Sequence, residues 1–519
     1  MTLLRAHPDH ASPRARAFAT LAVLWTIAIV ALVLAAIQAV SFRQSASGRE
    51  TLARVRAYWA ARAGVEAQIA KLASNTLNPD PNSALTINSD LQAAANGTLT
   101  GASYSVAHFE NGKLVDGAAD AGSKLNVNVM DPDDLILLES MDETTAGSIV
   151  TWIQGAAATD LTTSSTGSAP TIGSANFTTM GAASGSSSTA SSSSSSGATG
   201  AGASALFGTA TNVIMPFSYN PNSTTANTLT TNTSPDAGAY LGLRYPYSPR
   251  SAPVRSLLEL ELVTGVTSLA LRGEDWNLNG RLDPNENDGD WSWPPDNADG
   301  KLDAGWSQYL TASSELGGMA FTGVSRLDLS IASNSDIVSR LNVDTNQAGI
   351  ISQHATSGDL TDFVRTPLSQ LAPSGTTLLN GQPVTTVNPL STTQLTALLN
   401  ECTIGNPAAV LPRCGRFNIN TISRETLERF SRISPDMADT LIQARDGAAG
   451  GFVNLTDLLN VQGVTPAILA DLMGVLDVRS NVYIATSRGR DTASGVEVEI
   501  VAELDRSTIP VVIKDLIVR

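Results

Sequence analysis

The stretch that decides the fold is Ala17–Phe42, AFATLAVLWTIAIVALVLAAIQAVSF, which holds no Asp, Glu, Lys or Arg. At about 1.5 Å of rise per residue, an uncharged helix of this length crosses a hydrocarbon core about 30 Å thick. A cleaved secretory signal has a shorter apolar run followed by a small-residue cleavage site, and no such site follows here. Instead Leu52, Val55 and Trp59 continue at helical spacing, so the sequence predicts one long helix, apolar first and amphipathic afterwards.

A short polar leader precedes the apolar stretch. Residues 1–16 carry three arginines and are followed by the small residue Ala17 and then by Phe18. This arrangement resembles the leader of type IV prepilins, the precursors of bacterial pilins and pseudopilins. In that family a prepilin peptidase cuts on the cytoplasmic side. The resemblance therefore implies processing between Ala17 and Phe18, with the apolar helix kept on the mature chain.

Two residues differ from the usual prepilin pattern. Most members have Gly before the cut, where this chain has Ala17, and most have Glu as the fifth mature residue, where this chain has Ala22. A carboxylate inside a bilayer is costly without a partner, and in this family it pairs with a neighbouring subunit's N-terminal amine. A chain without it resembles the K-class minor pseudopilins of type II secretion, which lie at the filament tip. The alternative for this stretch alone is a plain signal-anchor helix.

The bulk composition narrows the class of function. The chain has 519 residues and a net charge of −16, which argues against non-specific binding to nucleic acid or anionic lipid, because both favour basic patches. No HExxH, GxSxG or Walker sequence is present, and only four histidines occur, so we expect no enzymatic activity. Cys402 and Cys414 have no flanking histidine and favour a disulfide over a metal site in an oxidising compartment.

An internal repeat organises the middle of the chain. The copy LNVNVMDPDDL at 125–135 has a counterpart, FNINTISRETL, at 417–427, and a weaker copy starts at Leu327. The later part repeats as well, because LLELELVTGVT at 257–267 parallels LTDLLNVQGVT at 455–465. Each copy predicts a short extended piece, a capping Asp or Ser, and two helical stretches joined by a tight turn. These are helix-hairpin-helix-like (SAM-like) units, which need neighbours to bury their apolar faces.

Strands are expected on both sides of the repeats. Residues 75–95 are polar and turn-rich, and the Asn-Gly pair within 101–117 then predicts a β-hairpin. Three β-like runs, 482–485, 496–502 and 510–518, close the chain and would return to these first strands. We therefore expect an α+β fold, in which a long N-terminal helix and a pilin-like antiparallel sheet are interrupted by a large, mainly helical insertion.

The sharpest local motif is DWNLNGRLDPNE at 275–286. It fits the EF-hand calcium loop, with oxygen-bearing side chains at the first, third and fifth places, Gly at the sixth and Glu at the twelfth. Ca²⁺ prefers about six to eight oxygen ligands, and the glycine permits the sharp turn. The predicted ligands are Asp275, Asn277, Asn279, Arg281 through its carbonyl, Asp283 and Glu286. The alternative is an accidental Asn/Asp-rich turn. Because regular flanking helices are not evident, we expect a structural site rather than a sensor.

A second acidic cluster follows the first loop. Asn297, Asp299 and Asp303 copy the centre of a calcium loop, but Pro295 and Trp306 occupy its end positions. A second Ca²⁺ site and a solvated acidic loop are therefore both open readings of this cluster.

The expected segments follow from these features. They are a leader (1–17), a transmembrane helix (18–42), a pilin-like helix with the first strands (43–124), an inserted helical domain (125–479) containing a Ser/Gly-rich loop (157–235) and the calcium loops (275–303), and the last strands (480–519). The Ser/Gly-rich loop predicts disorder, because it cannot bury enough apolar surface to offset chain entropy.

The helix-hairpin-helix pattern also raises a DNA-binding interpretation. The hairpin of the clearest copy, ISPD at 433–436, has no glycine and carries an acid, and GVT at 463–465 keeps one glycine with no lysine after it. We therefore interpret the units as packing and protein-contact modules. The main rival is a membrane-anchored DNA receptor of the competence type, and a third reading is a minor pilin of a type IV pilus.

The resemblance to K-class minor pseudopilins implies a function and a set of partners. It implies a single-pass protein of the bacterial inner membrane with most of its chain in the periplasm. There it would join I-class and J-class minor pseudopilins in a tip complex that initiates the pseudopilus and limits its length. The implied partners are those subunits, the major pseudopilin, the prepilin peptidase and secreted cargo, with no nucleic acid. Calcium would brace the loops of the insertion.

Overall fold

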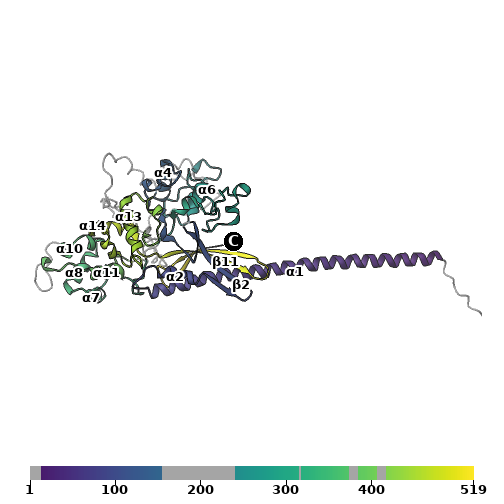
Figure 1. Cartoon of the computed structure of the whole chain (residues 1–519), viewed down its shortest axis with the longest axis horizontal. Coiled ribbons are helices and arrows are strands. Elements are labelled where there is room, and N and C mark those ends of the chain that lie inside the picture. The colour runs from purple at the N-terminus through teal and green to yellow at the C-terminus, as the bar shows by residue number, and fades with distance from the viewer. Residues whose placement is uncertain (1–12, 111, 155–239, 315–316, 373–383, 406–415) are drawn as a thin grey trace, which may run out of the picture.

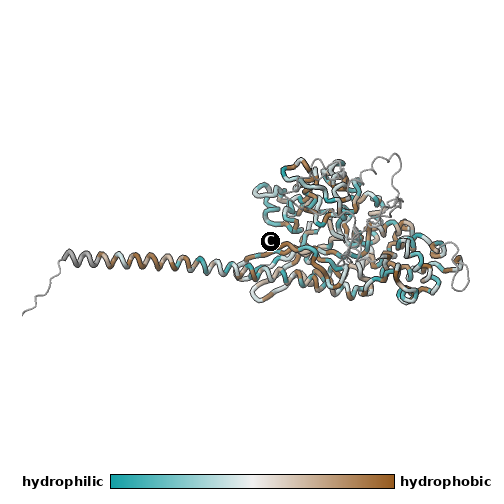
Figure 2. The backbone as a smooth tube through the Cα atoms, turned by 180° about the vertical axis from the view of Figure 1, so that it is seen from behind, coloured by the Kyte–Doolittle hydropathy of each residue, from teal (hydrophilic) through white to brown (hydrophobic). Residues whose placement is uncertain are grey.

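A single helix dominates the shape of the molecule. The computed structural model describes residues 13–110, 112–154, 240–314, 317–372, 384–405 and 416–519. Helix α1 (Pro13–Leu77) runs without a break, and its first part projects away from the body of the protein (Figure 1). This projecting part is strongly apolar (Figure 2), and within the described residues α1 is the helix long and apolar enough to cross a membrane. The predicted long N-terminal helix is confirmed.

The second part of α1 lies on an antiparallel sheet. The sheet has seven strands in the order β1-β2-β11-β12-β13, with β3 paired to β2 and β4 paired to β11. The strands are β1 (Asn96–Leu99), β2 (Ala102–Glu110), β3 (Lys113–Asp116), β4 (Ala119–Asp120), β11 (Val482–Asp491), β12 (Glu497–Asp505) and β13 (Val512–Val518). The first and last parts of the chain therefore build one sheet, as predicted.

Small residues bring α1 close to strand β11. Ala57 and Ala61 of the helix are fully buried against the sheet. A Cβ atom built on Gly489 would lie 1.9 Å from the carbonyl oxygen of Ala57, so this position of β11 accepts no side chain. Gly64 of α1 faces the same strand, because a Cβ there would lie 2.3 Å from the Ser487 hydroxyl oxygen.

The predicted apolar stripe of α1, formed by Leu52, Val55 and Trp59, is exposed to solvent and does not face the sheet. The side chains of Leu52, Val55 and Trp59 are 50%, 47% and 60% exposed, so they do not pack on the protein's own sheet. The buried face presents alanines where the helix meets β11, and further along it presents Val65 and Leu72, which are fully buried in the core between α1 and the sheet. The stripe is left as an uncovered apolar face within the described residues.

Two differences from the predicted strands and turns have local causes. Residues 75–95 contain helix α2 (Thr86–Ala93). This polar segment forms a helix because Ile87 and Leu91 are buried in the core between α1 and the sheet. Strand β11 continues past its predicted end at residue 485, because its later residues pair with both β2 and β12.

The inserted domain lies between β4 and β11 and consists of three units. Each unit opens and closes with a two-residue parallel strand pair: β5 (Leu125–Asn126) with β6 (Leu310–Thr311), β7 (Leu327–Asp328) with β8 (Cys402–Thr403), and β9 (Phe417–Asn418) with β10 (Leu476–Asp477). One continuous hydrophobic core runs through all three units, and a second core lies between α1 and the sheet. The predicted α+β class with a helical insertion is confirmed.

The helices of the units are short. After the 3₁₀ helix η1 (Ala121–Ser123), the first unit contains η2 (Val127–Val129), α3 (Pro132–Leu135), α4 (Glu143–Gln154), η4 (Leu257–Leu262), α6 (Ser268–Arg272), η5 (Pro284–Glu286), η6 (Gly289–Trp291) and η7 (Gly305–Gln308). The second contains α7 (Asn334–Leu341), α8 (Thr345–His354), α9 (Asp362–Arg365), α10 (Leu368–Leu371), η8 (Val384–Thr386) and α11 (Thr392–Glu401). The third contains α12 (Arg424–Leu427), α13 (Pro435–Gly447), η9 (Leu455–Asn460) and α14 (Pro466–Leu472).

The repeated asparagines explain why the sequence repeats. In the third unit, the amide of Asn420 accepts a hydrogen bond from the Phe452 backbone nitrogen at 2.8 Å and donates to the carbonyls of Phe452 and Val478, both at 2.8 Å. In the first unit, Asn128 makes the matching set of bonds with Val254 and with the carbonyl of Ala312. Each asparagine thus joins the opening strand of its unit to the middle and the end of that unit.

We expect Asn420→Ala to destabilise the inserted domain by roughly 3 kcal/mol, because buried backbone groups of Phe452 and Val478 lose their partners. Chemical unfolding of the full chain in detergent, followed by tryptophan fluorescence, measures this as a lower midpoint. The matched control is Asn334→Ala on the exposed start of α7, which should change stability by less than about 0.5 kcal/mol. Equal midpoints for the two variants would contradict the role given to Asn420.

Candidate metal centre in the first unit

The predicted calcium loops lie in an extension of the first unit. In the third unit, only residues 473–475 separate α14 from β10. In the first unit, residues 273–309 separate the corresponding helix α6 from β6. The two helices correspond because each follows a six-residue 3₁₀ helix and each has a Thr cap, Thr267 or Thr465, that accepts from a backbone nitrogen of its first turn. The acidic loops therefore form an insertion at one defined place in a repeated unit.

The two outer carboxylates of the first loop turn inward. Asp275 accepts from the backbone nitrogens of Asn279 and Gly280 at 2.9 and 3.0 Å. Glu286, eleven places later, accepts from the backbone nitrogens of Trp276 and Asp283 at 3.1 and 3.0 Å. Gly280 has a φ of +65°, the left-handed conformation for which the sequence predicted a glycine.

The remaining predicted ligands meet in the same loop. The amides of Asn277 and Asn279 both donate to one oxygen of Asp283, at 2.8 and 3.0 Å. The oxygen and nitrogen of an amide are placed by their hydrogen bonds, and a cation at this point would favour the oxygen of each. Arg281 enters the loop through its backbone, whose nitrogen donates to Asn279 at 2.7 Å. All the predicted first-loop residues are therefore brought together.

Burial makes these carboxylates unusual. Only 3% of Asp275 and 1% of Glu286 is exposed to solvent. Desolvation raises the pKa of Asp275 to about 6. It also raises the pKa of Glu286 to about 7, and the negative charges of Asp275 and Asp283 add to that increase. Buried acids that repel one another gain most from a bound cation, and the donors are the hard oxygens that Ca²⁺ prefers.

The second cluster has an arrangement that the sequence did not reveal. Its predicted end position, Trp306, is a buried indole that donates to the Glu139 carbonyl and provides no oxygen ligand. Glu274 supplies the carboxylate instead, because its two oxygens accept from the backbone nitrogens of Asn297 at 3.2 Å and Asp303 at 3.1 Å. Glu286 accepts two backbone hydrogen bonds within the first loop in the same way.

The other predicted members of the second cluster make local turns. Asn297 accepts from the Asp299 nitrogen at 2.9 Å, and Asp303 accepts from the Gly305 nitrogen at 3.0 Å. Glu274 is 7% exposed, and desolvation raises its pKa. Sequence spacing missed Glu274 because it precedes the first loop. The available signal was the acidic pair Glu274-Asp275, which places one carboxylate toward each loop.

The described residues contain no ready-made cluster of three or more His, Cys, Asp or Glu side chains arranged for a metal ion. The donor set of the first loop is mixed, because it combines carboxylates with the asparagine amides and a backbone carbonyl. Such oxygen ligands suit Ca²⁺ rather than Zn²⁺, which prefers Cys and His.

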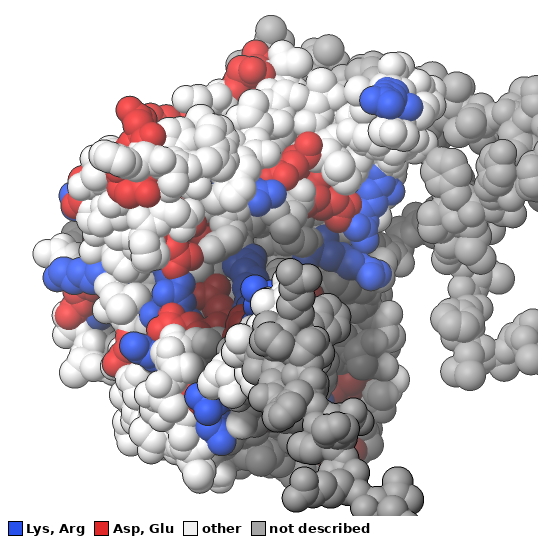
Figure 3. All heavy atoms as spheres, turned by 90° about the vertical axis from the view of Figure 1, so that its right-hand side faces the viewer, with Lys and Arg blue, Asp and Glu red and all other residues white. Residues whose placement is uncertain are grey.

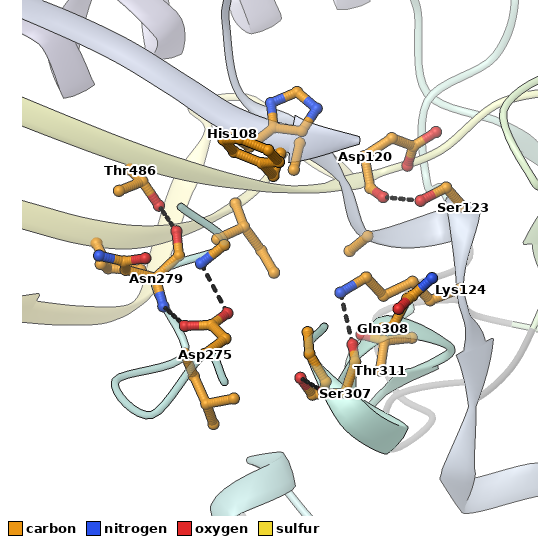
Figure 4. Close-up of a pocket in the computed structure, with 18 of the residues that line it drawn as sticks. His108, Asp120, Ser123, Lys124, Asp275, Asn279, Ser307, Gln308, Thr311 and Thr486 are labelled. Atoms are coloured by element: carbon orange, nitrogen blue, oxygen red, sulfur yellow. Dashed lines mark hydrogen bonds between the residues drawn. The ribbon is translucent and has the colours of Figure 1, made fainter. Parts of the chain in front are cut away.

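A cavity of about 330 Å³ lies beside the first metal loop and is lined by residues of that loop and of the sheet (Figure 4). Lys124 lies on one side of it and donates to the Ser307 carbonyl at 2.7 Å, and burial lowers the pKa of its ammonium group. Asp275 lies on another side, with its charge favouring the charged form of Lys124.

The remaining predicted sites are only partly covered by the structure. Ala17 and Phe18, the predicted processing site, are part of helix α1. Cys402 is buried, and burial raises the pKa of its thiol to about 12. Its predicted partner Cys414 lies outside the described residues, so the disulfide stays a prediction. The Ser/Gly-rich loop, 157–235, lies outside them too.

Comparison with known proteins gives two matches. The family model described as helix-hairpin-helix motif matches residues 414–477, which contain the third unit. No curated protein matches. Among solved structures, a chain of the GspK-GspI-GspJ complex from the type 2 secretion system of enterotoxigenic Escherichia coli matches with 11% identity and a TM-score of 0.37, covering 91% of this chain and 99% of that chain.

We expect the metal-free protein to lose stability as the pH rises from about 4 to about 7. The pKa of Glu286 is raised above the value of an unfolded chain, so the folded state binds its proton more tightly and is favoured at low pH. Glu286→Gln should flatten this loss by roughly 1–3 kcal/mol. Unfolding midpoints measured in chelator across this range test the expectation. A pH profile that the substitution leaves unchanged would contradict it.

Proposed function

We propose that this protein is a non-enzymatic minor pseudopilin of the K class, which lies at the tip of a type II secretion pseudopilus. The observation that carries the proposal is α1 itself: its apolar part projects from the body, and its alanine face packs on an antiparallel sheet. The basic leader before Phe18 supports it, because a prepilin peptidase requires such a leader. The missing glutamate at Ala22 favours a position with no subunit above.

The setting follows from the same features. The projecting helix anchors the chain in the bacterial inner membrane, and the body lies in the periplasm. The inserted domain makes the body much larger than a helix with one sheet, so further subunits cannot stack past it. Such a subunit initiates the filament, limits its length, meets the major pseudopilin below it and faces secreted cargo at the tip.

The uncovered stripe of α1 supports a helical partner. Leu52, Val55 and Trp59 lie at the spacing of one helix face and stay exposed, just beyond the apolar segment. A face of this kind suits the N-terminal helices of the I-class and J-class minor pseudopilins, which would bundle with α1 as it leaves the membrane.

We expect Trp59→Ala to weaken co-purification with I-class and J-class partners by at least about tenfold, because a large exposed aromatic side chain is a typical binding hot spot. Tandem affinity purification from membranes that express the three subunits measures the loss. The matched control is Trp291→Ala, which removes an exposed tryptophan far along the chain and should leave the complex intact. Loss of the complex with the control variant alone would place the contact elsewhere.

We also propose that the metal loops bind two Ca²⁺ ions. The first ion would take oxygens from Asp275, Asn277, Asn279, Asp283 and Glu286 and the carbonyl of Arg281. The second would take those of Asn297, Asp299 and Asp303, with Glu274 in place of the missing terminal glutamate. The support for both is the inward-facing buried carboxylates, and the role of the ions is structural.

Calcium should raise the unfolding temperature of the full chain, by an amount equivalent to about 2.7 kcal/mol at a hundredfold excess over its Kd. The variant Asp275→Asn/Glu286→Gln should abolish the response of the first site, and Glu274→Gln should reduce the calorimetric stoichiometry from about two ions to about one. Asp290→Asn, an exposed acid of the same segment, is the control and should bind as the unmodified chain does. Absence of any calcium response in the unmodified chain would refute the proposal.

The helix-hairpin-helix match favours a second candidate, a membrane-anchored DNA receptor. The local chemistry opposes it. At the start of α13, Ser434 accepts from the backbone nitrogen of Met437, and Asp436 lies in the first turn, where it would repel a phosphate. On the face seen in Figure 3, Lys and Arg side chains lie among Asp and Glu. A DNA-binding assay on the full chain at low and moderate salt separates the two functions, because tight, salt-dependent binding would support the receptor.

A further inference from the structure

The first metal loop is bound to the sheet through its backbone as well as its side chains. The carbonyl of Gly280 accepts from the backbone nitrogen of Phe109 on β2 at 2.6 Å. The carbonyl of Asn279 accepts from the hydroxyl of Thr486 on β11 at 2.6 Å (Figure 4). These bonds fix the turn on which the loop's central ligands are carried.

Charged groups of the sheet continue the contact. Arg488 on β11 bonds to Asp283 of the loop and, at 2.7 Å, to Glu499 on β12. Glu499 also accepts from the Asn279 amide at 3.0 Å. Arg519, directly after β13, donates to the carbonyl of Asn277. Residues on or next to four strands therefore hold one loop. Those of β11, β12 and the end of β13 bond to residues predicted to bind the metal, and Phe109 of β2 bonds to the glycine between two of them.

Strand β11 has the metal loop on one face and α1 on the other. Thr486 and Arg488 point to the loop, whereas Ser487 and Gly489 face α1, in the alternation expected of a strand. The inserted domain also meets the sheet elsewhere, since Asn418 donates to Asp120 at 3.0 Å. The first loop is therefore one of several contacts between the inserted domain and the sheet, and it is the contact that a bound metal ion would stabilise.

We infer that the sheet is part of the calcium site: Thr486 and Arg488 are positioning residues that hold the first loop in its binding shape. Calcium bound there in turn holds the inserted domain against β11, the strand whose other face packs on α1. The inference rests on the proposed calcium function. It adds that binding of the ion is coupled to ordering of the contact between the first loop and strands β2 and β11. Each therefore strengthens the other by the same factor.

Thr486→Val tests the coupling because it keeps the shape of the side chain and removes the donor to Asn279. Calcium titration of the full chain in detergent should show a Kd about three- to tenfold weaker, the effect of one lost hydrogen bond. Thr486→Ser keeps a hydroxyl and should restore the affinity. Ser487→Ala, on the same strand but facing α1, is the matched control and should bind as the unmodified chain does.

Hydrogen exchange on the unmodified chain provides a test that needs no variant. Removing calcium with a chelator should speed exchange of the Phe109 amide at least tenfold, because its acceptor, the Gly280 carbonyl, is released. The amides that pair β12 with β13 should exchange as before.

The outcomes separate the two proposals. A chain that binds calcium, with an unchanged Kd in Thr486→Val and unchanged exchange at Phe109, would overturn the coupling and leave the calcium function in place. A chain that binds no calcium would overturn both. A weaker Kd in Ser487→Ala equal to that in Thr486→Val would mean that β11 acts through general stability, and would also overturn the assignment of Thr486.

Discussion

The close approach of α1 to strand β11 is the constraint on which the rest of the structure depends. A side chain at Gly489 would collide with the backbone of the helix at Ala57 and Ala61. The contact therefore needs small residues on both sides, and dense packing of this kind leaves little freedom in the angle of the helix. Beside this contact, the large apolar side chains of Leu52, Val55 and Trp59 face outward, where another helix can cover them. One consequence of the contact is that β11 is held in one place and can support the metal loop on its opposite face.

The inserted domain shows how a small repeated unit can be adapted. The three units are closed by the same two-residue strand pairs, and the first and third use an asparagine in the same way. Only the first unit carries the acidic extension between its last helix and its closing strand, and this extension contacts the sheet. The third unit, which matches the helix-hairpin-helix model, keeps the short connection. The residues that pack the units are thus separate from those proposed to bind metal.

Much of the fold could be predicted from the sequence, because its strongest signals are local. The apolar stretch, the repeated asparagines and the spacing of Asp275 to Glu286 each lie within a short window, and the structure brings the residues of that loop together. The features that were missed depend on contacts between distant segments. Glu274 closes the second loop from outside its window, and the later residues of β11 form a strand only because β2 and β12 lie on either side. Arg488 resembles an ordinary surface arginine until the fold places it beside Asp283.

The N-terminal residue of the mature chain tests most directly the proposal that this protein is a processed pseudopilin. The protein would be recovered from membranes of cells with and without the prepilin peptidase, and its first residue would be identified by mass spectrometry. The account predicts Phe18 in the presence of the peptidase and Met1 in its absence. An intact Met1 in both, or a cut beyond residue 42, would contradict it, and the chain would then be an anchored or secreted protein of another class.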